Sequence, residues 1–221
     1  MPLRTILFDL DGTLADTAPD LAYALNRTLE HAGQAPLPFD VIRPVVSHGG
    51  TALLHLGFGH ELPEDEFDCL RDFFLDIYHS NITRGTRLFP GMTELLAEIE
   101  TRGLNWGVVT NKPTWLTDPL MAGLDLADRA ITVVSGDTLP ERKPHPAPML
   151  LACNEAGSAA AECLYLGDAE RDIAAGRNAG MATLVALYGY IGSEDHPADW
   201  GADGEVNAPL DLLHWLDRRI A

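Results

Sequence analysis

The residues best suited to chemistry gather in four short polar segments. They read DLDGT at residues 9–13, TNK at residues 110–112, KP at residues 143–144 and GD at residues 167–168, with Asp172 four residues further on. Each segment alone has an ordinary structural role, since Asp and Thr cap helices and Gly-Asp forms turns. Gathered in one crevice, their carboxylates would repel one another unless a cation neutralised them. An all-oxygen site of that kind suits Mg²⁺.

Two lysines lie within these segments, and the chain has no others. Lys112 and Lys143 stand against thirteen arginines. A compact ammonium on a flexible stem is a good partner for a phosphate or for an aspartate nucleophile. We expect a functional role for Lys143, whereas Lys112 fits a solvated position before Pro113 equally well.

Short apolar runs indicate the elements that must position these residues. Five runs resemble strands buried on both faces, and helical patterns with a glycine after them lie between the later runs. This alternation predicts an α/β fold with a doubly wound, Rossmann-like parallel sheet. The predicted strands are residues 5–8, 106–109, 131–134, 163–166 and 183–187, with a sixth near Glu205 and Val206; the predicted helices are residues 93–102, 146–156, 170–179 and a closing helix over 210–220.

The four polar segments follow four of the predicted strands. In an open parallel sheet, ligands bind beyond the carboxyl ends of the strands. We therefore expect the carboxylates, the hydroxyl of Thr110 and the ammonium of Lys143 to converge at one edge of the sheet.

A helical cap is predicted between the first two strands. Almost a hundred residues separate them, although a crossover needs only about a dozen or more. Apolar stripes at helical spacing begin at Leu21 and at Phe67. We place a small cap at residues 16–84 and the catalytic core at residues 1–15 and 85–221.

Composition narrows the classes of partner. With 33 acidic against 15 basic residues, the formal charge is −18, which disfavours nucleic acid and anionic lipid. No apolar stretch approaches the roughly 20 residues that span a bilayer, and Asp9 interrupts the only candidate signal segment. Three widely spaced cysteines without a CxxC pattern resemble buried thiols. We expect a cytoplasmic protein with a small-molecule partner, no nucleic acid and no membrane.

The motifs resemble those of the haloacid dehalogenase superfamily. DLDGTLADT, VVTNKP, the KPHP around Lys143 and LGDAERDIAAGRNAG match its four motifs in order and spacing over the whole chain. Within it, VTNKP and the pair Tyr188 and Tyr190 resemble the phosphoglycolate phosphatase group. The stretch YGYIGSEDHPADWGAD also resembles bacterial N-acetylmuramic acid 6-phosphate phosphatases.

This resemblance implies a Mg²⁺-dependent phosphatase with an aspartyl-phosphate intermediate. Asp9 would attack phosphorus, and Asp11 would protonate the leaving alkoxide and then deprotonate the hydrolytic water. Asp9, the backbone carbonyl of Asp11 and Asp168 would hold Mg²⁺. Lys143 would act on the transferring oxygens.

The resemblance also implies supporting roles for three further residues. Thr110 and the Asn111 amide would bind the transferring oxygens. Asp172 would orient Lys143 or a metal-bound water.

Other members of the superfamily and one other class offer alternatives. Dehalogenases resemble this chain but lack an acid at the position of Asp11, and phosphonoacetaldehyde hydrolases need a cap lysine that residues 16–84 do not contain. Phosphohexomutases stay open, because they differ by cap residues that one sequence does not rank. A phospho-aspartate signalling switch fits less well, since its accepting Asp lies on a later strand.

Substrate choice is expected from cap residues 43–50. Arg43, Ser47, His48 and Gly49 offer a cation, a hydroxyl, an imidazole and flexible backbone. Arg43 would pair with a substrate carboxylate, which both 2-phosphoglycolate and N-acetylmuramic acid 6-phosphate carry. A solvated helix end is the competing interpretation of Arg43 and His48.

Overall fold

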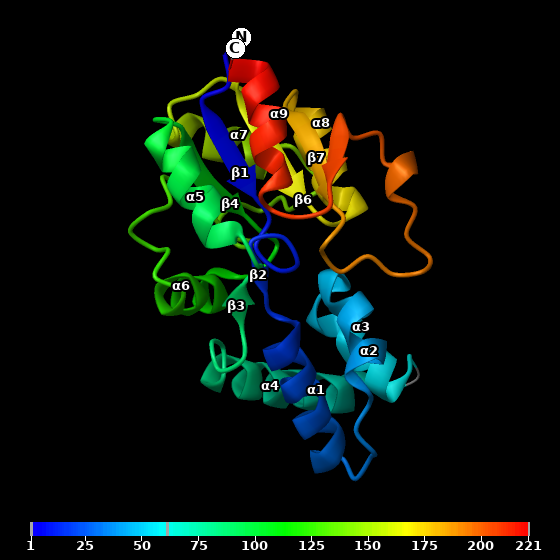
Figure 1. Ribbon diagram of the computed structural model, residues 1–221. Helices are drawn as coiled ribbons and strands as arrows, with labels where there is room; N and C mark the ends of the chain where they lie inside the picture. Colours follow the sequence, from blue (N-terminus) through cyan, green and yellow to red (C-terminus); the bar gives the residue numbers. More distant parts are fainter. Residues whose placement is uncertain (1, 61, 221) are drawn as a thin grey trace.

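A six-stranded parallel sheet forms the centre of the larger part of the molecule (Figure 1). The computed structural model describes residues 2–60 and 62–220. The spatial order of the strands is β5-β4-β1-β6-β7-β8. Their bounds are Thr5–Phe8 (β1), Asn105–Val109 (β4), Val133–Val134 (β5), Cys163–Gly167 (β6), Ala182–Ala186 (β7) and Gly204–Val206 (β8).

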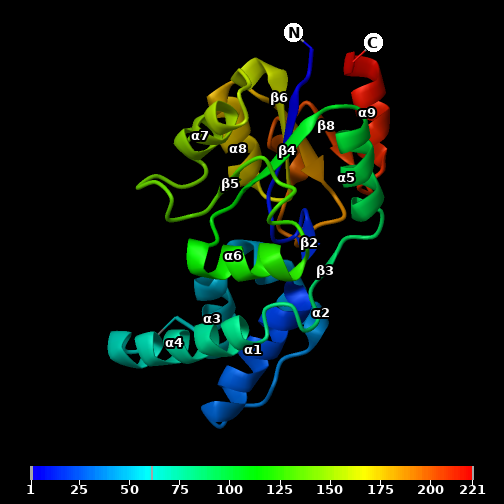
Figure 2. The same cartoon turned by 90° about the vertical axis from the view of Figure 1, so that its left-hand side faces the viewer.

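Helices cover both faces of this sheet. Figure 2 shows α7 and α8 on one side of the strands, and α5 and α9 on the other. The bounds are Met92–Thr101 (α5), Ala147–Glu155 (α7), Glu170–Ala179 (α8) and Asp211–Ile220 (α9). Because both faces are covered, the central strands are apolar without alternation, and all four residues of β1 are buried.

The register of the central strands brings the polar segments to one level. Phe8 pairs with Val108 on one side and with Leu166 on the other. Asp9, Thr110 and Asp168 therefore follow neighbouring strands at the same edge of the sheet.

The predicted α/β fold is confirmed, with two local differences. The third strand is shorter than predicted, since only Val133–Val134 pairs with β4, and Ile131 is 49% exposed. A core helix that was not predicted, α6 (Thr114–Gly123), follows β4.

Helices between β1 and α5 form a separate layer below the sheet in Figure 1. The chain enters and leaves this layer through a two-stranded antiparallel ribbon, β2 (Ala15–Asp16) and β3 (Arg87–Leu88). Its helices are α1 (Ala18–His31), α2 (Phe39–Ile42), the 3₁₀ helix η1 (Arg43–His48), α3 (Gly50–Phe58) and α4 (Glu64–Ser80). We call this layer the cap; the boundary at residues 16–84 remains a prediction.

Buried Asp20 fixes the first cap helix to the returning chain. Its carboxylate accepts hydrogen bonds from the backbone N–H groups of Gly85 and Thr86 and from the Thr86 hydroxyl, at 2.7–3.0 Å. Such charge-assisted bonds hold the two connections of the cap close together. Among the described residues, no helix has both the length and the apolar character needed to cross a membrane.

Candidate active site

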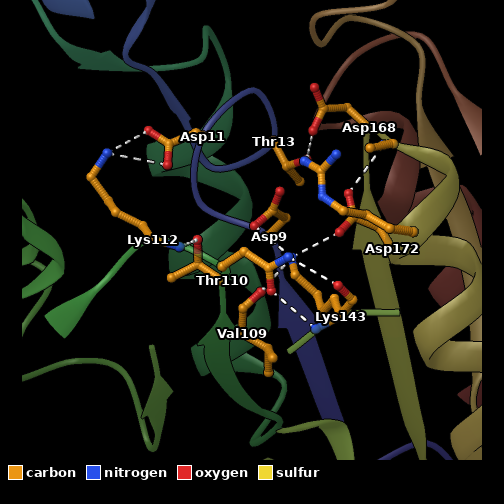
Figure 3. A network of polar contacts seen from close by, with 12 residues as sticks. Asp9, Asp11, Thr13, Val109, Thr110, Lys112, Lys143, Asp168 and Asp172 are labelled. Atoms are coloured by element: carbon orange, nitrogen blue, oxygen red, sulfur yellow. Dashed lines mark hydrogen bonds and ion pairs between the residues drawn. The ribbon is translucent and has the colours of Figure 1, made fainter. Parts of the chain in front are cut away.

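Lys143 forms the centre of a buried polar cluster at the carboxyl edge of the sheet (Figure 3). Its Nζ lies 2.8 Å from Asp9 Oδ1 and 2.7 Å from Asp172 Oδ1. It also donates to the carbonyl of Val109 at 2.9 Å and to the hydroxyl of Tyr165 at 2.8 Å. Since the Lys143 side chain is only 1% exposed, these groups replace its water.

Three buried carboxylates meet beside this ammonium. One oxygen from each of Asp9, Asp168 and Asp172 lies within 4.8 Å of the others. Burial, reinforced by the charge of Asp172, raises the pKa of Asp9 to about 6 despite the opposing effect of Lys143. Burial, followed by the charges of Asp9 and Asp172, raises the pKa of Asp168 to about 7. The negative charges of these carboxylates lie close together, and their oxygens are the ligands that a hard divalent cation prefers.

Asp168 is held by donors from both the core and the cap. Thr13 Oγ1 donates to its Oδ1 at 3.1 Å, and the backbone N–H of Tyr190 donates to Oδ2 at 2.9 Å. Ser47, from the cap helix η1, donates to the same Oδ2 at 2.6 Å. Thus the cap contacts a carboxylate of the core directly.

Gly12 permits the sharp turn that brings these groups together. Its φ is +87°, and a Cβ at this position would lie 2.2 Å from Asp168 Oδ2. Any other residue would be strained and would displace that carboxylate.

Asp11 lies apart from the three-carboxylate cluster and pairs with the other lysine. Lys112 Nζ lies 3.0 Å from Asp11 Oδ1 and 3.3 Å from Oδ2, and Thr17 donates to Oδ1 at 2.6 Å. Lys112 also donates to the hydroxyl of Tyr78, on cap helix α4, at 2.8 Å. The Lys112 side chain is 6% exposed, so it is not a solvated loop residue.

Thr110 and Asn111 lie in the loop after β4, and their side chains form hydrogen bonds with the backbone of the two lysines. The Asn111 amide donates to the Lys143 carbonyl and its oxygen accepts from the Lys143 N–H, both at 3.0 Å. Thr110 Oγ1 accepts from the Lys112 N–H at 3.2 Å. In this arrangement Asn111 positions the segment that carries Lys143.

A cavity of about 310 Å³ lies between the cap and this edge of the sheet. Its polar lining includes Asp9, Asp11, Thr110, Asn111, Lys112 and Arg171, together with Ser47, His48 and Gly49 from the cap. Its apolar lining comes mainly from Leu21, Val46, Phe74, Leu75 and Leu116. The cavity therefore combines a charged end with an apolar wall.

Arg43 is not among the residues that line this cavity, contrary to the expectation for cap residues 43–50. Its guanidinium pairs with Asp16 at 2.7 Å and lies 4.8 Å from the ring centre of Tyr190. The reason is local: residues 43–48 form a 3₁₀ helix that directs Arg43 toward β2. Ser47, His48 and Gly49 do reach the cavity.

Sequence reasoning missed three residues of the site. Tyr78 and Tyr165 contribute hydroxyls to the two lysines, but each lies in an apolar pattern that indicates only a core position. Arg171 lines the cavity and donates to the Ser47 carbonyl. Its place between Asp168 and Asp172 in the fourth motif was the available signal.

Comparison with known proteins agrees with this geometry. The family model described as haloacid dehalogenase-like hydrolase matches residues 6–186. N-acetylmuramic acid 6-phosphate phosphatase from Pseudomonas aeruginosa is 44% identical over 221 residues, covering 100% of this chain and 97% of the relative. Phosphoglycolate phosphatase from Xanthomonas campestris pv. campestris is 42% identical over 209 residues, covering 95% and 94%.

A solved structure extends the similarity to three dimensions. The crystal structure of a predicted phosphoglycolate phosphatase from Haemophilus somnus is 30% identical, with a TM-score of 0.87, and the match covers 96% of this chain and 97% of that one. The family match runs from β1 to the end of β7 and includes the cap. The relatives from Pseudomonas aeruginosa and Xanthomonas campestris are both named phosphatases, and the chain belongs to the haloacid dehalogenase-like hydrolases, a family of enzymes.

Proposed function

We propose that this enzyme hydrolyses a small phosphate monoester through an aspartyl-phosphate on Asp9, with Mg²⁺ as cofactor. The observation that carries the proposal is that Asp9, Asp11 and Lys112 line one cavity. Lys143 donates a hydrogen bond to Asp9. A nucleophile, a separate carboxyl for proton transfer and a cation beside the nucleophile are among the groups that phosphoryl transfer needs.

The two carboxyls have different tasks because their surroundings differ. Asp9 Oδ1 is bound by Lys143, which orients the carboxylate for attack on phosphorus. As the bond from phosphorus to the leaving oxygen breaks, Asp11 gives that oxygen a proton. In the second step Asp11 takes a proton from the water that attacks the aspartyl-phosphate, so Asp9 and inorganic phosphate are released.

The three-carboxylate cluster fits a divalent metal. Asp9 and Asp168 are the side chains we assign as ligands, together with the backbone carbonyl of Asp11. Asp172 lies 2.7 Å from Lys143 Nζ, which supports its role in orienting that lysine. A bound Mg²⁺ would neutralise the carboxylates and the charge of the transferring phosphoryl group.

The cavity favours a leaving group that is larger than a two-carbon acid and partly apolar. Its volume of about 310 Å³ lies near the lower limit for cavities that enclose small organic ligands, which is roughly 300 Å³. The two-carbon acid of 2-phosphoglycolate would leave most of it to water, and the apolar wall formed by Val46, Phe74 and Leu116 would stay uncovered. We therefore favour N-acetylmuramic acid 6-phosphate, whose ring, acetyl and lactyl groups offer apolar surface.

A phosphatase assay tests the function and the substrate together. Phosphate release is measured for N-acetylmuramic acid 6-phosphate, 2-phosphoglycolate and glucose 6-phosphate, with Mg²⁺ and with excess chelator. We expect Mg²⁺-dependent release, with the highest kcat/KM on the first compound. A preference for 2-phosphoglycolate would overturn the substrate assignment alone, whereas an isomeric sugar phosphate without phosphate release would identify a mutase.

A further inference from the structure

Lys112 lies between the proposed acid and the cap. Its Nζ contacts both oxygens of Asp11, at 3.0 and 3.3 Å, and the hydroxyl of Tyr78 at 2.8 Å. It also lies 4.5 Å from the centre of the Tyr78 ring, within the range of a cation–π contact. One ammonium thus joins a core carboxylate to helix α4 of the cap (Figure 3 shows its two contacts with Asp11).

Tyr78 is held firmly enough to act as the cap side of this contact. The residue is 1% exposed and belongs to the same apolar cluster as Leu25 and Phe74. Because Tyr78 belongs to α4 and its ring is packed, its hydroxyl moves with this cap helix. If the cap moves away from the core, Lys112 loses both of its contacts with Tyr78.

The contacts also leave the two oxygens of Asp11 unequal. Oδ1 accepts from Thr17 at 2.6 Å and from Lys112 at 3.0 Å, whereas Oδ2 has the longer contact with Lys112 at 3.3 Å. A general acid must lie within hydrogen-bond distance of the leaving oxygen, and the less occupied Oδ2 is the atom free to do this. The direction in which Oδ2 is held depends on where the ammonium of Lys112 is held.

We propose that Lys112 is a positioning residue that couples the orientation of Asp11 to closure of the cap, with the Tyr78 hydroxyl as its partner on the cap. The proposal rests on the proposed function, because Asp11 is its acid. Closure then does more than exclude water: it places the acid only when the cap covers the substrate.

The test is the dependence of kcat/KM on the leaving group. Tyr78→Phe removes the hydroxyl and keeps the ring. Wild type and variant are compared on N-acetylmuramic acid 6-phosphate, phenyl phosphate and para-nitrophenyl phosphate, whose leaving groups need progressively less protonation. We expect a loss of about tenfold on the alkyl ester, part of what a general acid contributes, and a loss below about threefold on the nitrophenyl ester. Equal losses on all three esters, or no loss on the alkyl ester, would overturn the proposal.

Substitutions of Lys112 give a second, independent readout. Lys112→Met should show the same selective loss, whereas Lys112→Arg retains a cation and should recover part of the alkyl-ester activity. No recovery by Arg together with an equal loss on aryl esters would assign Lys112 to phosphate binding instead.

A matched control uses another contact between cap and core. His79, next to Tyr78, packs against Trp115 of α6 at 5.4 Å between ring centres, and neither residue is among those that line the cavity. Trp115→Leu should change the three esters in parallel or not at all. A selective alkyl-ester loss in this control would contradict a specific role for Lys112. If wild type releases no phosphate from any ester, the proposed function fails, and that outcome is distinct from failure of the coupling.

Discussion

Replacing Lys143 by Met should destabilise the fold in a way that depends on pH. The substitution keeps an unbranched apolar side chain, one atom shorter, and removes the ammonium. It leaves Asp9 and Asp172 without their cation, and it removes the donor that the Val109 carbonyl and the Tyr165 hydroxyl share. Because the Lys143 side chain is 1% exposed, water does not substitute for these bonds.

The size of the effect follows from breaking a buried ion pair. Removal of one partner typically costs about 3–5 kcal/mol, since the other charge stays buried and unpaired. Protonation of the carboxylates relieves that penalty. The pKa of Asp9 is raised to about 6 and that of Asp168 to about 7, above an ordinary value of 3.8, so both take up protons readily in the folded state.

The sign of the pH dependence follows from the same shifts. Between about pH 4 and pH 7 the folded state binds more protons than the unfolded state, so stability falls as the pH rises. Lys143→Met should steepen this fall. We expect a loss of free energy of unfolding of about 3–5 kcal/mol at pH 8 but only about 1–2 kcal/mol at pH 5.

Urea unfolding of the metal-free protein at both pH values measures this. Lys112→Met is the control, because the side chain of its partner Asp11 is 18% exposed, so water partly replaces the lost cation and the loss at pH 8 should be smaller than that of Lys143→Met. Equal destabilisation by Lys143→Met at pH 5 and pH 8 would refute the reasoning, since the carboxylates would then not be the origin of the penalty.

Three further predictions concern the site. Asp11→Asn should lower kcat/KM at least 100-fold on an alkyl phosphate but much less on para-nitrophenyl phosphate, and equal losses would remove the acid role. Mg²⁺ should raise the Tm of the substrate-free protein more at pH 8 than at pH 5, because Asp9 and Asp168 must be deprotonated to bind it; calorimetry showing the reverse would contradict the assigned ligands. Arg43→Ala should change kcat/KM equally for esters with and without a carboxylate, because Arg43 pairs with Asp16; a selective rise of KM for the carboxylate ester would restore the contact expected from the sequence.

The sheet was predictable because its central strands are buried on both faces. Residues 5–8 and 163–166 are apolar without alternation, and they form β1 and most of β6. Helix α6 escaped prediction because Pro119 lies inside it and Pro113 just before it, and proline usually interrupts a helix.

The candidate site was predictable only where a chemical group and a strand end coincide in the sequence. Asp9 and Asp168 met this condition, whereas Lys143 lies on the longer loop after β5, and the structure brings the three together. The partners of Arg43 and Lys112 depend on how the cap folds onto the core. That packing joins Lys112 to Tyr78, 34 residues away, and no local pattern encodes such a pairing.

The central claim is that Asp9 is the nucleophile of a phosphatase. It is tested most directly by phosphate release from N-acetylmuramic acid 6-phosphate by Asp9→Asn, measured with saturating Mg²⁺ beside the wild type. The variant should stay folded. Because an amide is a poor nucleophile, it should lose at least about a thousandfold in kcat. Release above a tenth of the wild-type rate would contradict the account.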